Sequence, residues 1–356
     1  MTSHGTPRDR ILTGDTPTGK LHLGHWVGSV KRRVELQDTH DCFFILANMH
    51  AFTTRSDQPD EIRADTLEIV RDLLCMGIDP ERASIFLQSE VPAIAELTFL
   101  FSMLLPFNRV MRNPTLKEEI KVKGLGENYP FGFPLYAVGQ TADILAFRPV
   151  GVPVGEDQVP HLELTREVAR RFNQKYCNVG DKVEDADHVD EGGVFPVPVA
   201  DVGAVGRLVG IDGANKMSKS LNNAIYISDT AKQVQKKVNK IFTGRQSPTE
   251  PGDPDNILMQ YCDIFIPDQD RVAELRRKYA AGEDIGDGHI KQELGASINA
   301  LLEPMRERRL QFEQDSDVID VLKRGTIEAN RVTEETLAMA KEAAGLGFFP
   351  RTLDIH

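Results

Sequence analysis

The feature that most constrains the fold of this chain is the alternation of short apolar runs with amphipathic segments through its first half. Residues 42–47 (CFFILA) are apolar throughout, as expected of a strand buried on both faces of a parallel sheet. The apolar residues of 61–76 recur at helical spacing, and Gly77 follows them as a stop signal. Strands that alternate with helices predict a parallel sheet covered by helices, and therefore an α/β fold.

The same patterns predict the other elements. Further strands are expected at 10–14, 84–87 and 150–154, and further helices at 25–37, 93–105, 136–147 and 158–173. From Ala231 onward the pattern is mostly helical, with helices expected at 231–242, 256–265, 268–281, 289–315, 317–323 and 329–344. A chain of 356 residues exceeds what one core usually organises, so we expect two domains. We place them at 1–215, with a helical insertion at about 106–149, and at 216–356.

Composition excludes several classes of protein. Apolar residues make up 40% and charged residues 27%, which excludes disorder over the whole chain. The longest mostly apolar stretch, 97–107, has 11 residues, whereas a membrane helix needs roughly 20. The first ten residues lack the apolar core of a signal peptide, and no two of the 4 cysteines are close in sequence. We therefore expect a cytoplasmic protein with reduced cysteines, no membrane association and no cysteine-based zinc site.

The charge distribution bears on nucleic-acid binding. A net charge of −12 argues against a protein that coats nucleic acid, but a local basic patch is enough for an RNA partner. Residues 1–215 carry 22 Lys+Arg against 31 Asp+Glu, whereas residues 216–356 carry 20 against 23. An RNA partner is therefore expected at the C-terminal part. The acidic segment 181–191 is typical of an exposed loop that needs no function.

A first motif follows the first expected strand. A Gly/Pro/Thr loop leads into His22-Leu23-Gly24-His25, which opens the next expected helix. The two histidines are three residues apart, so they lie on one side of the first helical turn. Imidazoles at that place can donate to phosphate oxygens, aided by the free backbone N–H groups and the helix dipole. Gly24 has no side chain, which leaves room for a nucleotide base beside the backbone.

A second motif, Lys216-Met217-Ser218-Lys219-Ser220, lies just before the helical region. Two mobile ammonium groups suit the charge that develops on a triphosphate as pyrophosphate leaves. The alternative is a solvated loop that uses lysine for solubility, but chance occurrence of this five-residue string is improbable.

Together the two motifs resemble the two signatures of class I aminoacyl-tRNA synthetases. Three further strings resemble the bacterial tryptophanyl-tRNA synthetases: 13–19 (TGDTPTG), 141–145 (TADIL), and 152–158 (VPVGEDQ) followed by 161–166 (HLELTR). The resemblance runs from about Ile11 to Phe348. It implies a Rossmann-type catalytic domain followed by an α-helical anticodon-binding domain. It also implies an enzyme that activates L-tryptophan with ATP to tryptophanyl-adenylate and transfers it to tRNA(Trp), releasing AMP and pyrophosphate.

The resemblance also implies roles for individual residues. Catalytic roles fall on His22, His25, Lys216 and Lys219. ATP contacts fall on Thr16, Pro17, Thr18, Gly24, His25, Gly155, Glu156, Asp157, Leu208, Lys216, Met217, Ser218, Lys219 and Ser220. The tryptophan pocket would be formed by Asp143, Gln158, Gln140, His50, Val152 and Val154. Mg²⁺ should accompany ATP, no residue is assigned as a metal ligand, and the resemblance implies a homodimer.

Asp143 has a physical argument of its own. Tryptophan has one polar side-chain group, an N–H that can only donate. A buried carboxylate is a matching acceptor, and phenylalanine would leave that carboxylate unpaired at high cost. Asp143 is therefore predicted to accept the indole N–H.

Two residues depart from the common family pattern. Thr16 stands where many members have a glutamine that reaches the substrate carboxylate, and His25 stands where many have asparagine.

Three basic clusters could contact tRNA phosphates, or could equally be solvated helix faces. They are Lys232, Lys236, Lys237, Lys240 and Arg245; Arg271, Arg276, Arg277 and Lys278; and Arg306, Arg308 and Arg309.

Three other functions remain open. A tyrosyl-tRNA synthetase fits both signatures but usually has a different string at 155–158. A small nucleotidyltransferase also uses H-x-G-H, but it is shorter and lacks the second motif. A non-catalytic RNA-binding paralogue is disfavoured by the intact signatures.

Overall fold

The centre of the molecule is a parallel sheet of five strands in the order β3-β2-β1-β4-β5. In this computed structural model, residues 9–350 and 353 are described, apart from 123, 127, 155–158, 203–207, 220, 246, 248 and 284. The strands are β1 (Arg10–Asp15), β2 (Asp41–Leu46), β3 (Ala83–Leu87), β4 (Gly151–Val154) and β5 (Val199–Val202). The predicted α/β fold with a parallel sheet is confirmed, and β5 is a strand that the sequence patterns did not indicate.

The sheet is buried on both faces, as the apolar run in β2 predicts. Cys42, Phe44 and Leu46 contribute to one apolar cluster, whereas Phe43 and Ile45 contribute to the other. The alternation follows from the period of two of a strand, which sends successive side chains to opposite faces.

Helices surround the sheet and continue beyond it. Those of the sheet region are α1 (Leu23–His25), η1 (Trp26–Val30), α2 (Lys31–Leu36), α3 (Asn48–Arg55), α4 (Pro59–Cys75), η2 (Gln88–Glu90), α5 (Pro92–Ser102), α6 (Phe107–Val110), α7 (Pro114–Val122), α8 (Gly132–Leu145), α9 (Val159–Tyr176) and η4 (Asp185–Asp187). Those of the C-terminal region are α10 (Ala231–Val238), α11 (Ile257–Phe265), α12 (Gln269–Ala281), α13 (Asp287–Arg309), η5 (Leu310–Phe312) and α14 (Asp315–Ala343). Among the described residues, no helix is both long enough and apolar enough to cross a membrane.

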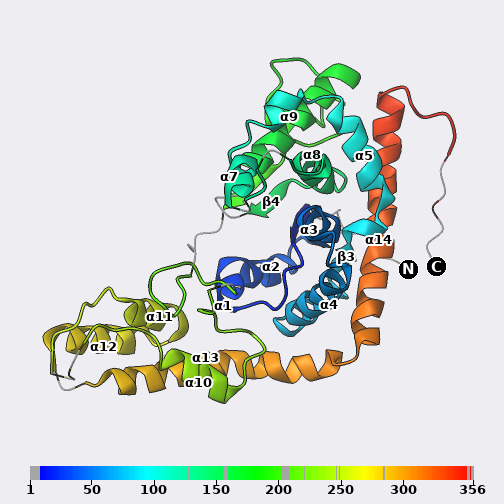
Figure 1. Cartoon of the computed structure of the whole chain (residues 1–356). Coiled ribbons are helices and arrows are strands. Elements are labelled where there is room, and N and C mark those ends of the chain that lie inside the picture. Colours follow the sequence, from blue (N-terminus) through cyan, green and yellow to red (C-terminus); the bar gives the residue numbers. More distant parts are fainter. Residues whose placement is uncertain are drawn as a thin grey trace.

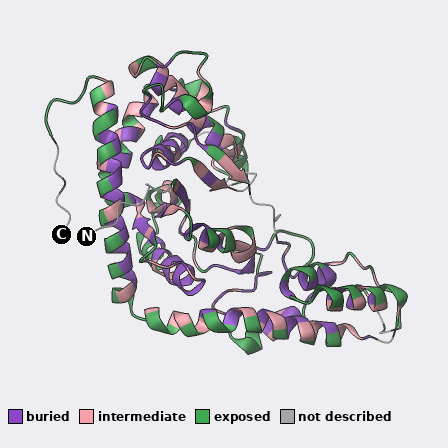
Figure 2. Cartoon of the chain, turned by 180° about the vertical axis from the view of Figure 1, so that it is seen from behind, coloured by how far each residue is buried: buried purple, intermediate pink, exposed green. Residues whose placement is uncertain are grey.

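The two longest helices frame the sheet region in an L shape (Figure 1). Helix α13 runs along one side and carries α10, α11 and α12, while α14 turns back along the edge strand β3. The buried face of α14 is turned toward the sheet region (Figure 2). At Gly325 the two elements are so close that an added Cβ would lie 2.0 Å from the carbonyl oxygen of Ile85, so this contact requires glycine.

Three predicted helices differ from the structure. Residues 317–323 and 329–344 belong to the single helix α14, so the predicted break between them is wrong. Burial against β3 offsets the low helix propensity of Gly325. The predicted helix 25–37 starts earlier, at Leu23, and contains the π-helical turn η1. Such turns often occur at functional sites, and Gly28 and Ser29 of η1 line the cavity described below.

The acidic segment 181–191 is mostly exposed, as predicted, but it is anchored at two points. Asp185 pairs with Arg166 and Arg170 of α9 at 2.7 and 2.6 Å. His188 is buried, and its ring lies 3.2 Å from the side-chain amide of Asn173. The segment is therefore a fixed part of the surface.

Candidate active site

A cavity of about 490 Å³ opens at the carboxyl ends of β1, β2 and β4. This is where ligands bind on open α/β sheets. The predicted residues that line it are Thr16, Thr18, His25, His50, Gln140, Asp143, Val152, Val154 and Lys216. The cavity therefore joins parts of both signatures to the side chains predicted to bind tryptophan.

The other predicted residues fall into three groups. Six of them do not line the cavity: Pro17, His22 and Gly24 lie in the first loop and the first signature, and Met217, Ser218 and Lys219 lie in the second signature. Leu208 is buried, and its carbonyl oxygen accepts the Met217 N–H at 3.0 Å. Gly155, Glu156, Asp157, Gln158 and Ser220 lie outside the described residues.

The two histidines of the first signature stack against each other. Their ring centroids are 3.8 Å apart, and Nδ1 of His25 accepts the backbone N–H of His22 at 3.1 Å. Burial, with the nearby charges of His25 and Lys219, lowers the pKa of His22 to about 3. Burial also lowers the pKa of His25 to about 4, although Asp15 acts against it. Near neutral pH both rings are uncharged, and each retains one N–H to donate.

Gly24 brings the two signatures into contact. A Cβ at this position would lie 3.0 Å from the His22 ring and 3.5 Å from Cβ of Met217. The sequence suggests that the missing side chain makes room for a nucleotide base. In this structure His22 and Met217 lie beside Gly24, and a larger residue would already crowd the His22 ring.

Asn223 shapes the second signature, and sequence reasoning missed it. Its buried side chain accepts the Ser218 N–H at 2.7 Å and donates to the Lys216 carbonyl at 3.2 Å and to Asp212 at 2.9 Å. Gly210 makes room for this amide, because a Cβ there would lie 2.1 Å from its nitrogen. Met217 between the two lysines is fully buried. The backbone of the loop is thus fixed, while Lys216 is exposed.

The side chain of Lys219, from the second signature, contacts the loop that follows β1. Its Nζ donates to the carbonyl oxygens of Thr18 and Gly19 at 2.9 and 2.5 Å. Burial lowers the pKa of Lys219 to about 8, against the opposing effect of nearby carboxylates, of which Asp65 contributes most. The ammonium group of Lys219 therefore connects the second signature to the loop that follows β1.

An ion pair at the end of β1 was also missed. Arg33 of α2 donates to both carboxylate oxygens of Asp15, at 2.5 and 3.3 Å, and to Ser29 Oγ at 2.9 Å. Burial alone would raise the pKa of Asp15, but the guanidinium of Arg33 holds it below its usual value. The pair fixes the point at which the Gly/Pro/Thr loop leaves the sheet.

Asp143 lies on α8, lines the same cavity and is 5% exposed. Nε2 of Gln88 donates to both of its carboxylate oxygens at 2.8 Å. Burial raises the pKa of Asp143 to about 7, although the hydrogen bond from Gln88 acts to lower it. His50 stacks on Tyr136 beside it, with ring centroids 4.3 Å apart. The arrangement is a desolvated acceptor in an aromatic-lined cavity, which suits a flat ligand with one N–H donor.

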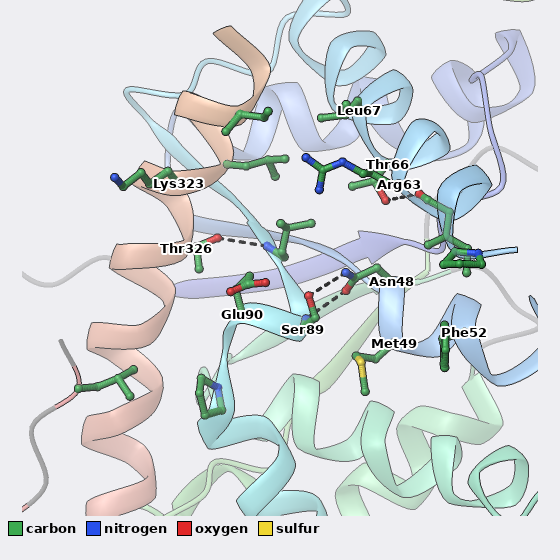
Figure 3. Close-up of a pocket in the computed structure, with 17 residues that line it drawn as sticks. Asn48, Met49, Phe52, Arg63, Thr66, Leu67, Ser89, Glu90, Lys323 and Thr326 are labelled. Atoms are coloured by element: carbon green, nitrogen blue, oxygen red, sulfur yellow. Dashed lines mark hydrogen bonds between the residues drawn. The ribbon is translucent and has the colours of Figure 1, made fainter. Parts of the chain in front are cut away.

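A second cavity has a volume of about 760 Å³ and is shown in Figure 3. It is lined by residues of α3, α4, η2 and α14, among them Asn48, Phe52, Ser89, Glu90 and Lys323. Among the described residues, none of those predicted to bind ATP or tryptophan lines it.

Comparison with known proteins places the chain in a family. Residues 6–303 match the tRNA synthetases class I (W and Y). The tryptophan–tRNA ligase of Clostridium longisporum is 40% identical over 348 residues, which is 96% of this chain and 98% of that protein. That of Treponema pallidum is 43% identical over 347 residues, again 96% of this chain and 98% of that protein.

A solved structure agrees with these relatives. The tryptophanyl-tRNA synthetase of Campylobacter jejuni, complexed with ADP and tryptophan, superposes with a TM-score of 0.81. It is 31% identical, and the match covers 95% of this chain and all of that one. This chain therefore belongs to the class I tRNA synthetases of the W and Y family, among the bacterial tryptophan–tRNA ligases.

Proposed function

We propose that this chain activates L-tryptophan with ATP and transfers it from tryptophanyl-adenylate to tRNA(Trp), releasing AMP and pyrophosphate. The observation that carries the proposal is that one cavity is lined by His25 of the first signature, by Lys216 of the second and by the buried carboxylate of Asp143. Similarity to tryptophan–tRNA ligases over nearly the whole chain supports it.

In this mechanism the tryptophan carboxylate attacks the α-phosphate of ATP in line, and pyrophosphate leaves. The protein's main contribution is alignment and charge stabilisation. The uncharged rings of His22 and His25 donate to phosphate oxygens, and the ammonium groups of Lys216 and Lys219 stabilise the charge of the leaving pyrophosphate. Asp143 accepts the indole N–H and so selects the amino acid.

Mg²⁺ accompanies ATP in this proposal and offsets phosphate charge. Among the described residues, no group of three His, Cys, Asp or Glu side chains is arranged to hold a metal ion. The ion would therefore be held mainly by the phosphates, as is usual for Mg²⁺ with nucleotides.

The remaining parts of the proposal concern the whole protein. The catalytic domain spans 1–215, with the helical insertion at about 106–149, and 216–356 contains the loop of the second signature and the anticodon-binding helices. The protein acts in the cytoplasm as a homodimer. The exposed apolar side chains of Phe99, Met103 and Phe107 support a subunit contact at α5 and α6. The mass in solution measured by light scattering tests the dimer.

Pyrophosphate–ATP exchange tests the activity. The assay is run with tryptophan, with tyrosine and without amino acid, and is followed by charging of tRNA(Trp) and tRNA(Tyr) transcripts. The proposal predicts exchange with tryptophan alone and charging of tRNA(Trp) alone. Exchange with tyrosine would indicate a tyrosyl enzyme. Tight tRNA binding without exchange would indicate a non-catalytic paralogue.

A further inference from the structure

Gln88, which the motifs do not include, is the first residue of the short turn η2 at the carboxyl end of β3. Its side chain is about nine-tenths buried, and both polar atoms are used. Nε2 donates to the two carboxylate oxygens of Asp143, and Oε1 accepts the backbone N–H of His50 at 3.1 Å. Among the described residues, Gln88 is the one hydrogen-bond donor to Asp143.

The turn that carries Gln88 is held from its far side (Figure 3). Asn48 Nδ2 donates to Ser89 Oγ at 2.8 Å, and Asn48 Oδ1 accepts the Ser89 N–H at 3.0 Å. From α14, Thr326 accepts the N–H of Leu87 at 3.3 Å, and Asn330 donates to the carbonyl of Glu90 at 2.8 Å. The backbone on both sides of Gln88 is thus fixed by two helices, so the amide presents its N–H groups from a set position.

A set position matters because a carboxylate can rotate. It has about four lone-pair sites, and a buried carboxylate with no fixed partner would turn toward any available donor. Gln88 takes one site on each oxygen and leaves the others for a ligand. The substrate N–H then meets an acceptor whose orientation is already set, and preorganisation of this kind reduces the cost of binding.

We propose that Gln88 is a positioning residue for amino-acid selection. It fixes the orientation of the Asp143 carboxylate, which can then accept a hydrogen bond from the ring N–H of a ligand in the cavity. The inference rests on the proposed function. It adds a specificity determinant outside the motif strings and connects that determinant to the C-terminal helix α14.

Other titratable groups face the same cavity and are part of the test. Those on α3, α7, α8 and α9 are His50, Glu119, Tyr136 and His161, and the same cavity is also lined by Asp15, His25, Arg32, Arg33, Asp201 and Lys216. Burial raises the pKa of Tyr136, so its hydroxyl stays neutral through the working range. His50, Glu119, Tyr136 and His161 would affect the binding of any amino acid, with or without a ring N–H. The test therefore compares kcat/KM for tryptophan with kcat/KM for the analogue that has sulfur in place of the ring N–H. The ratio of the two values isolates the effect of the hydrogen bond from the ring N–H.

The test uses the full-length protein in pyrophosphate exchange from pH 6 to 9. Gln88→Met removes the donor at similar length, and Gln88→Glu keeps the shape but places a second carboxyl group beside Asp143, so that the two carboxyl groups resist ionising together. Both variants are expected to lower the selectivity ratio about tenfold, the equivalent of one charge-assisted hydrogen bond. They should also move the acid limb of kcat/KM for tryptophan to higher pH, because the lost bond favours the ionised carboxylate. The KM for ATP should stay unchanged.

Ser89→Ala is the matched control, because it removes one bond that holds η2 and does not touch Asp143. Melting temperatures show which variants fold. If Gln88→Met does not fold, the isosteric variant Gln88→Glu is used for the test. Wild-type selectivity and pH dependence in the folded Gln88 variants would overturn the inference while the proposed function stands. An equal effect of Ser89→Ala would overturn it too, since loosening of the turn would then suffice. Absence of tryptophan-dependent exchange in the wild type would instead contradict the proposed function itself.

Discussion

Asp143 shows how function and stability conflict at a single residue. A carboxylate that must accept an N–H has to be charged, yet its burial favours the neutral form. Its pKa is raised to about 7 in the folded protein, whereas an unfolded chain gives about 3.9. The folded state therefore binds the proton more tightly. The stability that Asp143 contributes is complete below about pH 4 and is lost as pH rises through about 7.

We predict that Asp143→Asn stabilises the protein more at pH 8 than at pH 5. Asparagine has nearly the same shape but no charge to desolvate. The gain in the free energy of unfolding, relative to wild type, should be on the order of 2 kcal/mol larger at the higher pH. Urea unfolding of both proteins at the two pH values measures it. An equal difference at both pH values would mean that Asp143 does not titrate between them.

The residues that the sequence did not reveal share one property. Gln88, Asn223 and the pair of Asp15 with Arg33 act through partners that only the fold brings close. Asp143, by contrast, lies in a string specific enough to be assigned directly. A glutamine directly after an apolar strand is the one signal in the sequence that points to Gln88.

At the scale of elements, the two signature loops contact each other. Met217 lies beside Gly24, and Lys219 donates to the loop that contains Thr18 and Gly19. ATP phosphates placed between the loops would compete with these carbonyl oxygens for the ammonium group. The contacts of Lys219 with substrate are therefore expected to become strongest as charge develops on the leaving pyrophosphate.

Lys219→Ala is predicted to lower kcat for tryptophan activation at least tenfold while changing the KM for ATP about threefold or less. The reason is that an interaction made mainly in the transition state affects kcat more than ground-state binding. Single-turnover adenylate formation separates the two effects. Lys182→Ala, in the exposed acidic segment, controls for loss of one positive charge. Equal losses in rate and in ATP affinity would indicate plain ground-state binding.

Gly24→Ala is predicted to lower activation at least tenfold with little change in overall fold. The added methyl group meets the His22 ring at 3.0 Å, so this ring must shift, and it comes into van der Waals contact with Met217 at 3.5 Å. The control is Gly288→Ala in α13, where an added Cβ meets no atom within 4 Å. The measurement is exchange activity beside far-UV circular dichroism. A Gly24→Ala enzyme as active as wild type would show that this contact is dispensable.

Most strands and helices could be predicted at this scale because apolar periodicity is a local signal. The sheet strands at 10–14, 42–47, 84–87 and 150–154 were found within a few residues of their observed bounds. The π-helical turn η1 and the unbroken α14 were not found. The first depends on the contacts of Ser29 and Arg33, and the second on burial of Gly325 against β3.

At the scale of the whole molecule, the structure separates the three basic clusters of the C-terminal region. Arg271, Arg276, Arg277 and Lys278 are all paired with carboxylates of their own region. Arg309 pairs with Asp72 and Glu68 of α4, and Arg308 donates to the Cys75 carbonyl. Asp72 in turn accepts the Leu21 N–H next to the first signature at 2.7 Å. The charges of these arginines are therefore used in contacts within the protein.

The first cluster is different. Lys237 pairs with Asp229, but Lys232, Lys236 and Lys240 are exposed and form no ion pair among the described residues. They recur every four residues and so follow one face of α10 and its end. Three unpaired cations in a row are the kind of surface that binds a phosphate backbone.

Replacing Lys232, Lys236 and Lys240 together by alanine is predicted to raise the KM for tRNA and leave tryptophan activation unchanged. Each lost phosphate contact should reduce the slope of log affinity against log salt by roughly 0.7–0.9. Charging kinetics across a salt series measure both effects. Arg277→Gln, which removes a cation already paired with Glu283, is the control and should leave the slope unchanged. Wild-type charging by the triple variant would make this face a solvated surface only.

The most direct test of the account is the choice between tryptophan and its analogue with sulfur in place of the ring N–H. The measurement is kcat/KM for both compounds in pyrophosphate exchange, with the wild type and with Asp143→Ala. A charge-assisted hydrogen bond contributes roughly 1.5–3 kcal/mol, so the wild type should prefer tryptophan by about one to two orders of magnitude. Asp143→Ala should lose most of that preference and keep its affinity for ATP. A wild-type enzyme that uses the sulfur analogue as well as tryptophan would contradict the assignment of Asp143 and the account built on it.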